Sequence, residues 1–214
     1  MNSVYCEVMK LSFAVRKQGN SILKVLFCLI ANFVCFGICY YSGFAVRLEH
    51  VGSFYAAAAF GLLPGIVVAI ISQLLYALFY FGFSNILLVL PVLLILWLIS
   101  AAVNYGWIDT VISSLGTMVL ASVLSMVLVL LISLMIGRNA FLIGTCWYDI
   151  YNVLGQYAQY GPLGASLVTV VPYALFNTCT TWVISMLAYR ITPKQTTLGF
   201  SDNRIYKKGL QNRK

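Results

Sequence analysis

The longest stretch without charge constrains the fold of this chain more than any other feature. Residues 51–83, VGSFYAAAAFGLLPGIVVAIISQLLYALFYFGF, contain no Lys, Arg, Asp or Glu. Uncharged apolar runs of about 18 residues or more are typical of membrane-spanning segments, and several occur here. Only 8% of the residues are charged and 62% are hydrophobic, whereas soluble domains carry about 25% charged residues. The sequence therefore predicts an integral membrane protein.

The length of the apolar runs favours helices over a β-barrel. Barrel strands alternate polar and apolar residues in short segments, whereas a helix pairs each backbone N–H and C=O within itself, as hydrocarbon requires. Outside residues 51–83, four runs are long enough to cross a bilayer: 22–44, 85–105, 111–136 and 163–189. We therefore expect an all-α, polytopic membrane protein.

The distribution of basic residues indicates an even number of crossings. Four of the thirteen Lys and Arg residues lie at or before position 24, where the first span begins, and seven follow the last span, which leaves only Arg47 and Arg138 between them. Lys and Arg are enriched in cytoplasmic segments near the membrane. Both termini are therefore expected in the cytoplasm, and a six-helix bundle satisfies this if residues 51–83 cross twice. The formal net charge of +8 then reflects orientation and contact with anionic lipid, not binding to nucleic acid.

Pro64 and Gly65 mark the place where residues 51–83 would turn, because Pro presets its own φ and Gly tolerates unusual dihedral angles. The first leg, 52–63, would be about 18 Å long, short of the roughly 30 Å hydrocarbon core. It must therefore incline, thin the bilayer or be shielded by neighbouring helices. The alternatives are one long helix kinked at Pro64, a re-entrant hairpin within 51–83, or an extra crossing within 138–162.

The spans divide the chain into three parts. These are a basic cytoplasmic segment at 1–20, a transmembrane helical domain at 21–190, and a basic cytoplasmic tail at 191–214. In this topology Arg47, Glu49 and His50 lie outside the membrane after the first span. Residues 138–162 form the longest outer connection.

The first span carries small residues on one face. Steps of three and four residues align the following: Cys28, Ala31, Cys35 and Cys39. Such faces let helix backbones approach closely in lipid, so Ala31, Cys35 and Cys39 are candidates for docking a partner helix. Packing within the chain is the alternative explanation. The six cysteines show no metal-ligand spacing, and we expect neither a metal nor a cofactor.

The outer connection combines aromatic rings with polar groups. At helical spacing Tyr148, Asn152 and Gln156 share one face, and Trp147 and Asp149 adjoin it. Such a surface suits a planar or amphipathic ligand, with an aromatic belt at the membrane interface as the alternative. We predict that these five side chains contact a ligand, with ring stacking from Trp147 and Tyr148.

Asn177 is a polar group within the last span, and its amide has several hydrogen bonds to satisfy. Intramembrane polar residues usually face the bundle or a cavity, so Asn177 joins the predicted ligand site. Asn32 is a further polar candidate in the first span. No nucleophile, zinc-hydrolase or P-loop motif is present, and His50 with the distant Asp149 is a weak pair. We therefore do not expect an enzyme.

Residues 48–75, LEHVGSFYAAAAFGLLPGIVVAIISQLL, resemble the early portion of the S components of energy-coupling factor (ECF) transporters. Many members carry an acidic-x-x-Gly segment, an Ala-rich helix, a Gly-Pro-x-x-Gly turn and another apolar helix. Glu49 and Gly52 match the first element, and Gly61, Pro64 and Gly65 match the turn in altered order. The resemblance covers fewer than about 30 residues, and no ligand-specific signature accompanies it.

The resemblance implies a bacterial plasma-membrane subunit that captures a vitamin-like small molecule near the outer face. A separate transmembrane coupling protein and cytoplasmic ATPases would drive its release inside. Members dock on the coupling protein through an Ala-x-x-x-Ala face of the first helix, where Ala31 matches the first position and Cys35 replaces the second Ala. The alternative function is a membrane sensor or assembly protein that acts through helix–helix contacts without transport.

Overall fold

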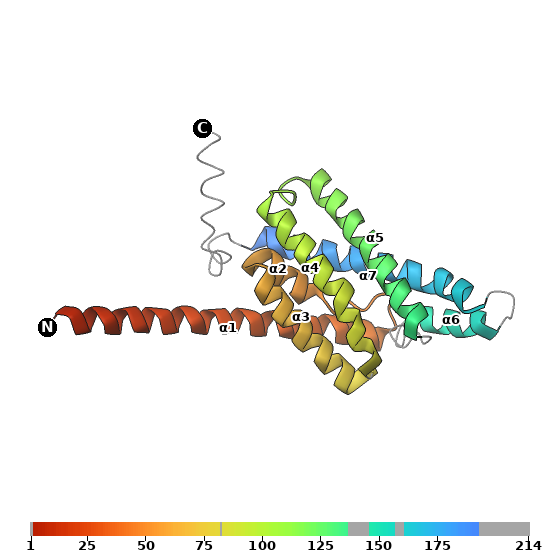
Figure 1. The fold of residues 1–214 in the computed structure, drawn as a ribbon, viewed down its shortest axis with the longest axis horizontal. Coiled ribbons are helices and arrows are strands. Elements are labelled where there is room, and N and C mark those ends of the chain that lie inside the picture. The colour runs from red at the N-terminus through yellow and green to blue at the C-terminus, as the bar shows by residue number, and fades with distance from the viewer. Residues whose placement is uncertain (1, 82, 137–145, 157–160, 193–214) are drawn as a thin grey trace.

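The structure of the protein is a computed structural model that describes residues 2–81, 83–136, 146–156 and 161–192. Within these residues the chain forms helices and no strand, and Figure 1 shows them gathered into one bundle. The predicted all-α membrane protein is therefore confirmed by secondary structure and by the apolar length of the helices.

Five of the described helices contain apolar stretches long enough to cross a bilayer. They are α1 (Asn2–Ser42), α3 (Leu62–Tyr76), α4 (Val89–Asn104), α5 (Val111–Ile136) and α7 (Gly161–Ile191). The four spans predicted outside residues 51–83 are confirmed, with ends that differ by a few residues. The apolar part of α1 is Ile22–Ser42, and the preceding half of this 41-residue helix projects away from the bundle (Figure 1).

Residues 51–76 fold into a helical hairpin whose turn is a single residue, Gly61. The short helix α2 (Val51–Phe60) ends there, and α3 begins at the next residue. Gly61 has φ 101° and ψ 174°, a conformation that residues with a Cβ rarely adopt. The predicted turn at Pro64 and Gly65 is therefore wrong by three residues, and so is the alternative of one long kinked helix.

Pro64 and Gly65 lie in the first turn of α3 and not in the turn between the two helices. Pro64 lies in the first helical turn, where a missing N–H breaks no intrahelical bond. A Cβ built on Gly65 would lie 2.7 Å from the Cβ of Ala57, so glycine at this position lets α2 and α3 pack in close contact. Ala57 and Gly65 are equally distant from Gly61 along the chain, as an antiparallel hairpin requires.

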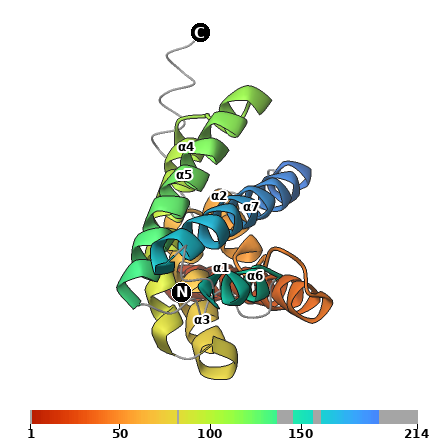
Figure 2. The same cartoon turned by 90° about the vertical axis from the view of Figure 1, so that its right-hand side faces the viewer.

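The helix α2 is short and enclosed by the rest of the bundle. Ten residues span about 15 Å, half of a hydrocarbon core, and nine of the ten are buried. Helices α1, α3, α4 and α7 contact it, and Figure 2 shows it near the centre of the view. Shielding by neighbours, one of the three predicted ways to accommodate a short leg, is the one that the structure adopts.

The apolar part of α1 begins at the end of the bundle where α7 finishes. The Lys24 ammonium lies 5.2 Å from the centre of the Phe60 ring, and the hydroxyls of Tyr55 and Thr192 are hydrogen-bonded at 3.0 Å. The start of the apolar part of α1 and the end of α7 therefore lie at the same end of the bundle. That this end faces the cytoplasm stays a prediction.

The opposite end of the bundle contains shorter elements. A π-helix, η1 (Ala77–Phe81), continues α3, and a 3-10 helix, η2 (Phe83–Leu88), leads into α4. Helix α6 (Cys146–Gln156) packs on α7 within the predicted outer connection.

Candidate functional site

The segment 43–50, which links α1 to α2, folds back into the bundle. Arg47, Glu49 and His50 are only 1%, 4% and 5% exposed. The sequence placed these residues on the outer side after the first span, which stays a prediction, and the structure shows that they are buried between helices. The reason is the position of α2, whose first turn is hydrogen-bonded to Asn32, far from the end of α1 at Ser42.

Asn32 joins the start of α2 to α1 and α3. Its side-chain oxygen accepts hydrogen bonds from the backbone N–H groups of Gly52 and Ser53, at 2.6 and 3.3 Å. Its amide nitrogen donates to the hydroxyls of Ser53 and Ser72, both at 2.9 Å. Asn32 therefore satisfies N–H groups that are left without partners at the start of every helix, although it is distant in sequence.

Asn177 on α7 holds the segment 43–50 in place. Its Oδ1 accepts hydrogen bonds from the backbone N–H groups of Arg47 and Leu48, at 3.1 and 3.3 Å. Leu48 has φ 54°, and such a left-handed conformation in a non-glycine residue costs about 1–3 kcal/mol. Strained residues of this kind cluster at functional sites, where surrounding contacts hold them.

Glu49 lies between two basic groups. Its Oε2 is 3.9 Å from Nη1 of Arg47, and its Oε1 is 3.7 Å from Nε2 of His50. With a neutral imidazole, the three residues carry no net formal charge, which is the least costly state for a buried cluster.

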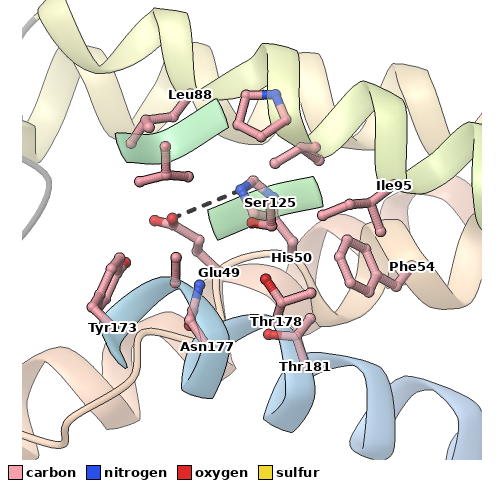
Figure 3. Close-up of a pocket in the computed structure, with 14 residues that line it drawn as sticks. Glu49, His50, Phe54, Leu88, Ile95, Ser125, Tyr173, Asn177, Thr178 and Thr181 are labelled. Atoms are coloured by element: carbon pink, nitrogen blue, oxygen red, sulfur yellow. Dashed lines mark ion pairs between the residues drawn. The ribbon is translucent and has the colours of Figure 1, made fainter. Parts of the chain in front are cut away.

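A cavity of about 40 Å³ adjoins this cluster between α2, α4, α5 and α7. Glu49 and His50 lie on one side of it, and Figure 3 shows side chains of α7 directed toward them from below. Leu88, Val92 and Ile95 provide apolar walls. The polar lining consists of Glu49, His50, Ser125, Tyr173, Asn177, Thr178 and Thr181.

Several polar groups around the cavity lack hydrogen-bond partners among the described residues. Nδ1 of His50 and Oγ1 of Thr181 are buried without one. The Glu49 carboxylate has its two ion-pair neighbours only at distances longer than a hydrogen bond. Buried polar groups are nearly always hydrogen-bonded, so this cavity suits a small polar molecule, or one polar group of a larger one.

The predicted aromatic residues of α6 lie beside the cavity but do not line it. Trp147 donates a hydrogen bond from Nε1 to the carbonyl oxygen of Ala45 at 2.9 Å, and its ring stacks on Phe176. Tyr148 packs on a buried cluster that includes Val129 and Tyr173, two residues of the cavity wall. Both aromatic residues therefore cover the segment 43–50 and the cavity wall from outside.

The structure separates the other predicted ligand residues. Asp149 and Asn152 are exposed on α6, and Gln156 ends that helix with its side chain outside the described part. Of the predicted set, Asn177 alone lines the cavity. A ligand-binding role for the α6 residues stays a prediction.

The small residues of α1 face mainly their own chain. A Cβ on Gly52 would overlap the carbonyl oxygen of Cys28, so close packing of α1 on α2 explains this part of the stripe. Cys39 is 3% exposed, and Ala31 and Cys35 are partly buried. Docking of a partner on Ala31, Cys35 and Cys39 stays a prediction.

Sequence reasoning missed Glu49 and His50 as cavity residues. One available signal was their position directly before the uncharged stretch 51–83, at the start of the helical hairpin. Across the described residues, no group of three or more His, Cys, Asp or Glu side chains could hold a metal ion. No protein-family model, no curated protein and no solved structure matches the chain.

Proposed function

We propose that this protein is the membrane-embedded substrate-binding subunit of a multi-component importer for a vitamin-like small molecule. The observation that carries the proposal is the buried cluster of Arg47, Glu49 and His50 beside a cavity within the helix bundle. Ionisable residues inside a membrane bundle are costly and usually mark the path of a substrate or ion.

The interrupted architecture of the bundle supports a transport role. Irregular backbone at membrane depth is tolerated where it is buried in protein or lines a cavity, and transporters place such breaks at their binding sites. Here the segment 43–50 is the break, and α2 is the half-length helix that follows it. A protein that acted only as an anchor would not require this arrangement.

Access to the site involves the contacts that cover it. A cavity of about 40 Å³ holds one polar group or a few waters, so a vitamin-sized ligand requires the site to open. Opening would have to break the hydrogen bonds that hold the segment 43–50 over the cavity. Trp147 donates one of them to Ala45, and the backbone N–H groups of Arg47 and Leu48 donate two to Asn177. Release inside would be driven by a coupling protein and ATPases, which the ECF resemblance implies.

A sensor or assembly protein is the second candidate. The first half of the continuous helix α1 projects beyond the bundle (Figure 1), and a partner could pack on it there. A pulldown from the native membrane separates the two functions. Recovery of a transmembrane coupling protein with ATPases supports import, whereas recovery of only a kinase or envelope machinery supports the sensor.

Ligand capture is tested with the purified full chain. Mass spectrometry of copurifying compounds, followed by thermal unfolding with each compound, should identify one that stabilises the protein. Thr181→Val should then weaken its binding about fivefold or more, because a hydroxyl in the cavity is lost. Thr180→Val is the matched control, since that hydroxyl bonds to the carbonyl of Phe176 in its own helix. Absence of any copurifying or stabilising compound would reject ligand capture.

A further inference from the structure

We propose that the cavity binds a cationic N–H group, such as a protonated amine, through the carboxylate of Glu49. This inference rests on the proposed function and names the chemistry of the group that enters the cavity. It depends on which charged residue lines the cavity, on the hydrogen bonds that the lining still lacks, and on the available volume.

The carboxylate, not the guanidinium, lines the cavity. Glu49 and His50 belong to its lining, whereas Arg47 does not, although its Nη1 is 3.9 Å from Oε2 of Glu49. A molecule in the cavity therefore meets the negative member of the pair first. An anion would enter against this carboxylate, and the described lining contains no Lys or Arg to offset the repulsion.

The lining offers acceptors that require donors. Among the described residues the carboxylate of Glu49 receives no hydrogen bond, since Arg47 and His50 are both beyond 3.5 Å from it. His50 presents Nε2 toward Glu49, so a neutral imidazole protonated there has a lone pair on Nδ1, which has no partner. Thr181 can accept as well as donate. An alkylammonium brings three donors, which matches this set.

The volume limits the ligand to its head group. About 40 Å³ accommodates a few waters, because about 10–15 Å³ of this volume is enough for one, or an ammonium group in their place. The remainder of a larger ligand would extend toward the segment 43–50 and α6. Occupation by water alone is the competing outcome that an experiment must exclude.

The test uses methylammonium as the probe and the full chain in detergent. Thermal unfolding is followed by tryptophan fluorescence in methylammonium chloride, sodium chloride or sodium formate at equal ionic strength. Methylammonium at ten times its Kd should raise Tm by about 3–6 °C over sodium chloride, and formate should not. A cavity that holds only water predicts equal Tm in all three salts, and stabilisation by formate indicates an anion site; either result overturns the proposal.

Variants assign the effect to Glu49. Glu49→Gln should abolish the methylammonium shift, whereas Asp109→Asn, the change of an acid to its amide at an exposed position outside the site, should keep it. Because Glu49→Gln leaves Arg47 without its carboxylate and can prevent folding, the double variant Arg47→Met with Glu49→Gln provides a charge-balanced second measurement. A shift that persists in the double variant rejects Glu49 as the binding group.

The two proposals can fail separately. If the copurifying compound is an anion and methylammonium does not displace it, import stands and the amine assignment is wrong. If methylammonium binds but no larger compound and no coupling partner is found, the amine site stands and the importer is wrong.

Discussion

At the residue scale, two asparagines within membrane helices organise the site. Asn32 accepts two backbone N–H groups from the first turn of α2, and Asn177 accepts two from the segment 43–50. Both could be recognised in the sequence as costly polar groups inside apolar spans. Their partners could not, because an amide in a helix gives no indication of which distant backbone it meets. The burial of Glu49 and His50 was missed for the same reason.

Replacement of Asn32 by leucine should strongly destabilise the protein. Leucine keeps the size of the side chain but leaves the N–H groups of Gly52 and Ser53 without their acceptor in a buried place. We expect a loss of about 2–3 kcal/mol, or a Tm lower by about 5–10 °C. Asn152→Leu on the exposed face of α6 is the control, and an equal loss there would contradict the capping role.

At the scale of elements, the hairpin of α2 and α3 depends on two glycines with different tasks. The sequence indicated a turn within residues 51–83 but offered three candidates in Gly61, Pro64 and Gly65. Turn propensity favoured the Pro-Gly pair, whereas the structure uses Gly61 for its φ and Gly65 for close packing on Ala57. Propensity could not separate these tasks, because close approach of helices is a tertiary property.

Alanine substitutions should show how much each glycine contributes to the stability of the fold. Gly61→Ala places a Cβ at φ 101° and should cost about 1–2 kcal/mol. Gly65→Ala brings its Cβ to 2.7 Å from that of Ala57 and should cost about 1–3 kcal/mol through overpacking. Gly37→Ala in α1 meets nothing within 4 Å and should stabilise by about 0.5–1 kcal/mol. Tm measurements in one detergent would compare them, and a neutral Gly61→Ala would contradict the turn geometry.

At the scale of the whole molecule, the bundle has two distinct ends. Lys24, Thr192 and Ile108 lie at one end, where Arg190 donates a hydrogen bond to the Ile108 carbonyl. The segment 43–50 and α6 meet at the other. Composition and the length of the apolar runs were sufficient to predict the fold class. They could not predict that the chain returns to the middle of the bundle after α1, because local hydropathy does not report depth.

Cysteine labelling in intact cells tests the orientation of the two ends. Cys146 is exposed on α6, and Asp109 is exposed in the connection between α4 and α5 at the opposite end. In a background with the other cysteines replaced by alanine, a membrane-impermeant maleimide should label Cys146 directly. Asp109→Cys, with Cys146 also replaced, should be labelled only after the membrane is permeabilised. Because five long helices and the enclosed α2 place these two sites at opposite ends, labelling of both sites in intact cells would contradict the fold. The reverse pattern would keep the fold but invert its orientation, and the candidate site would then open toward the cytoplasm.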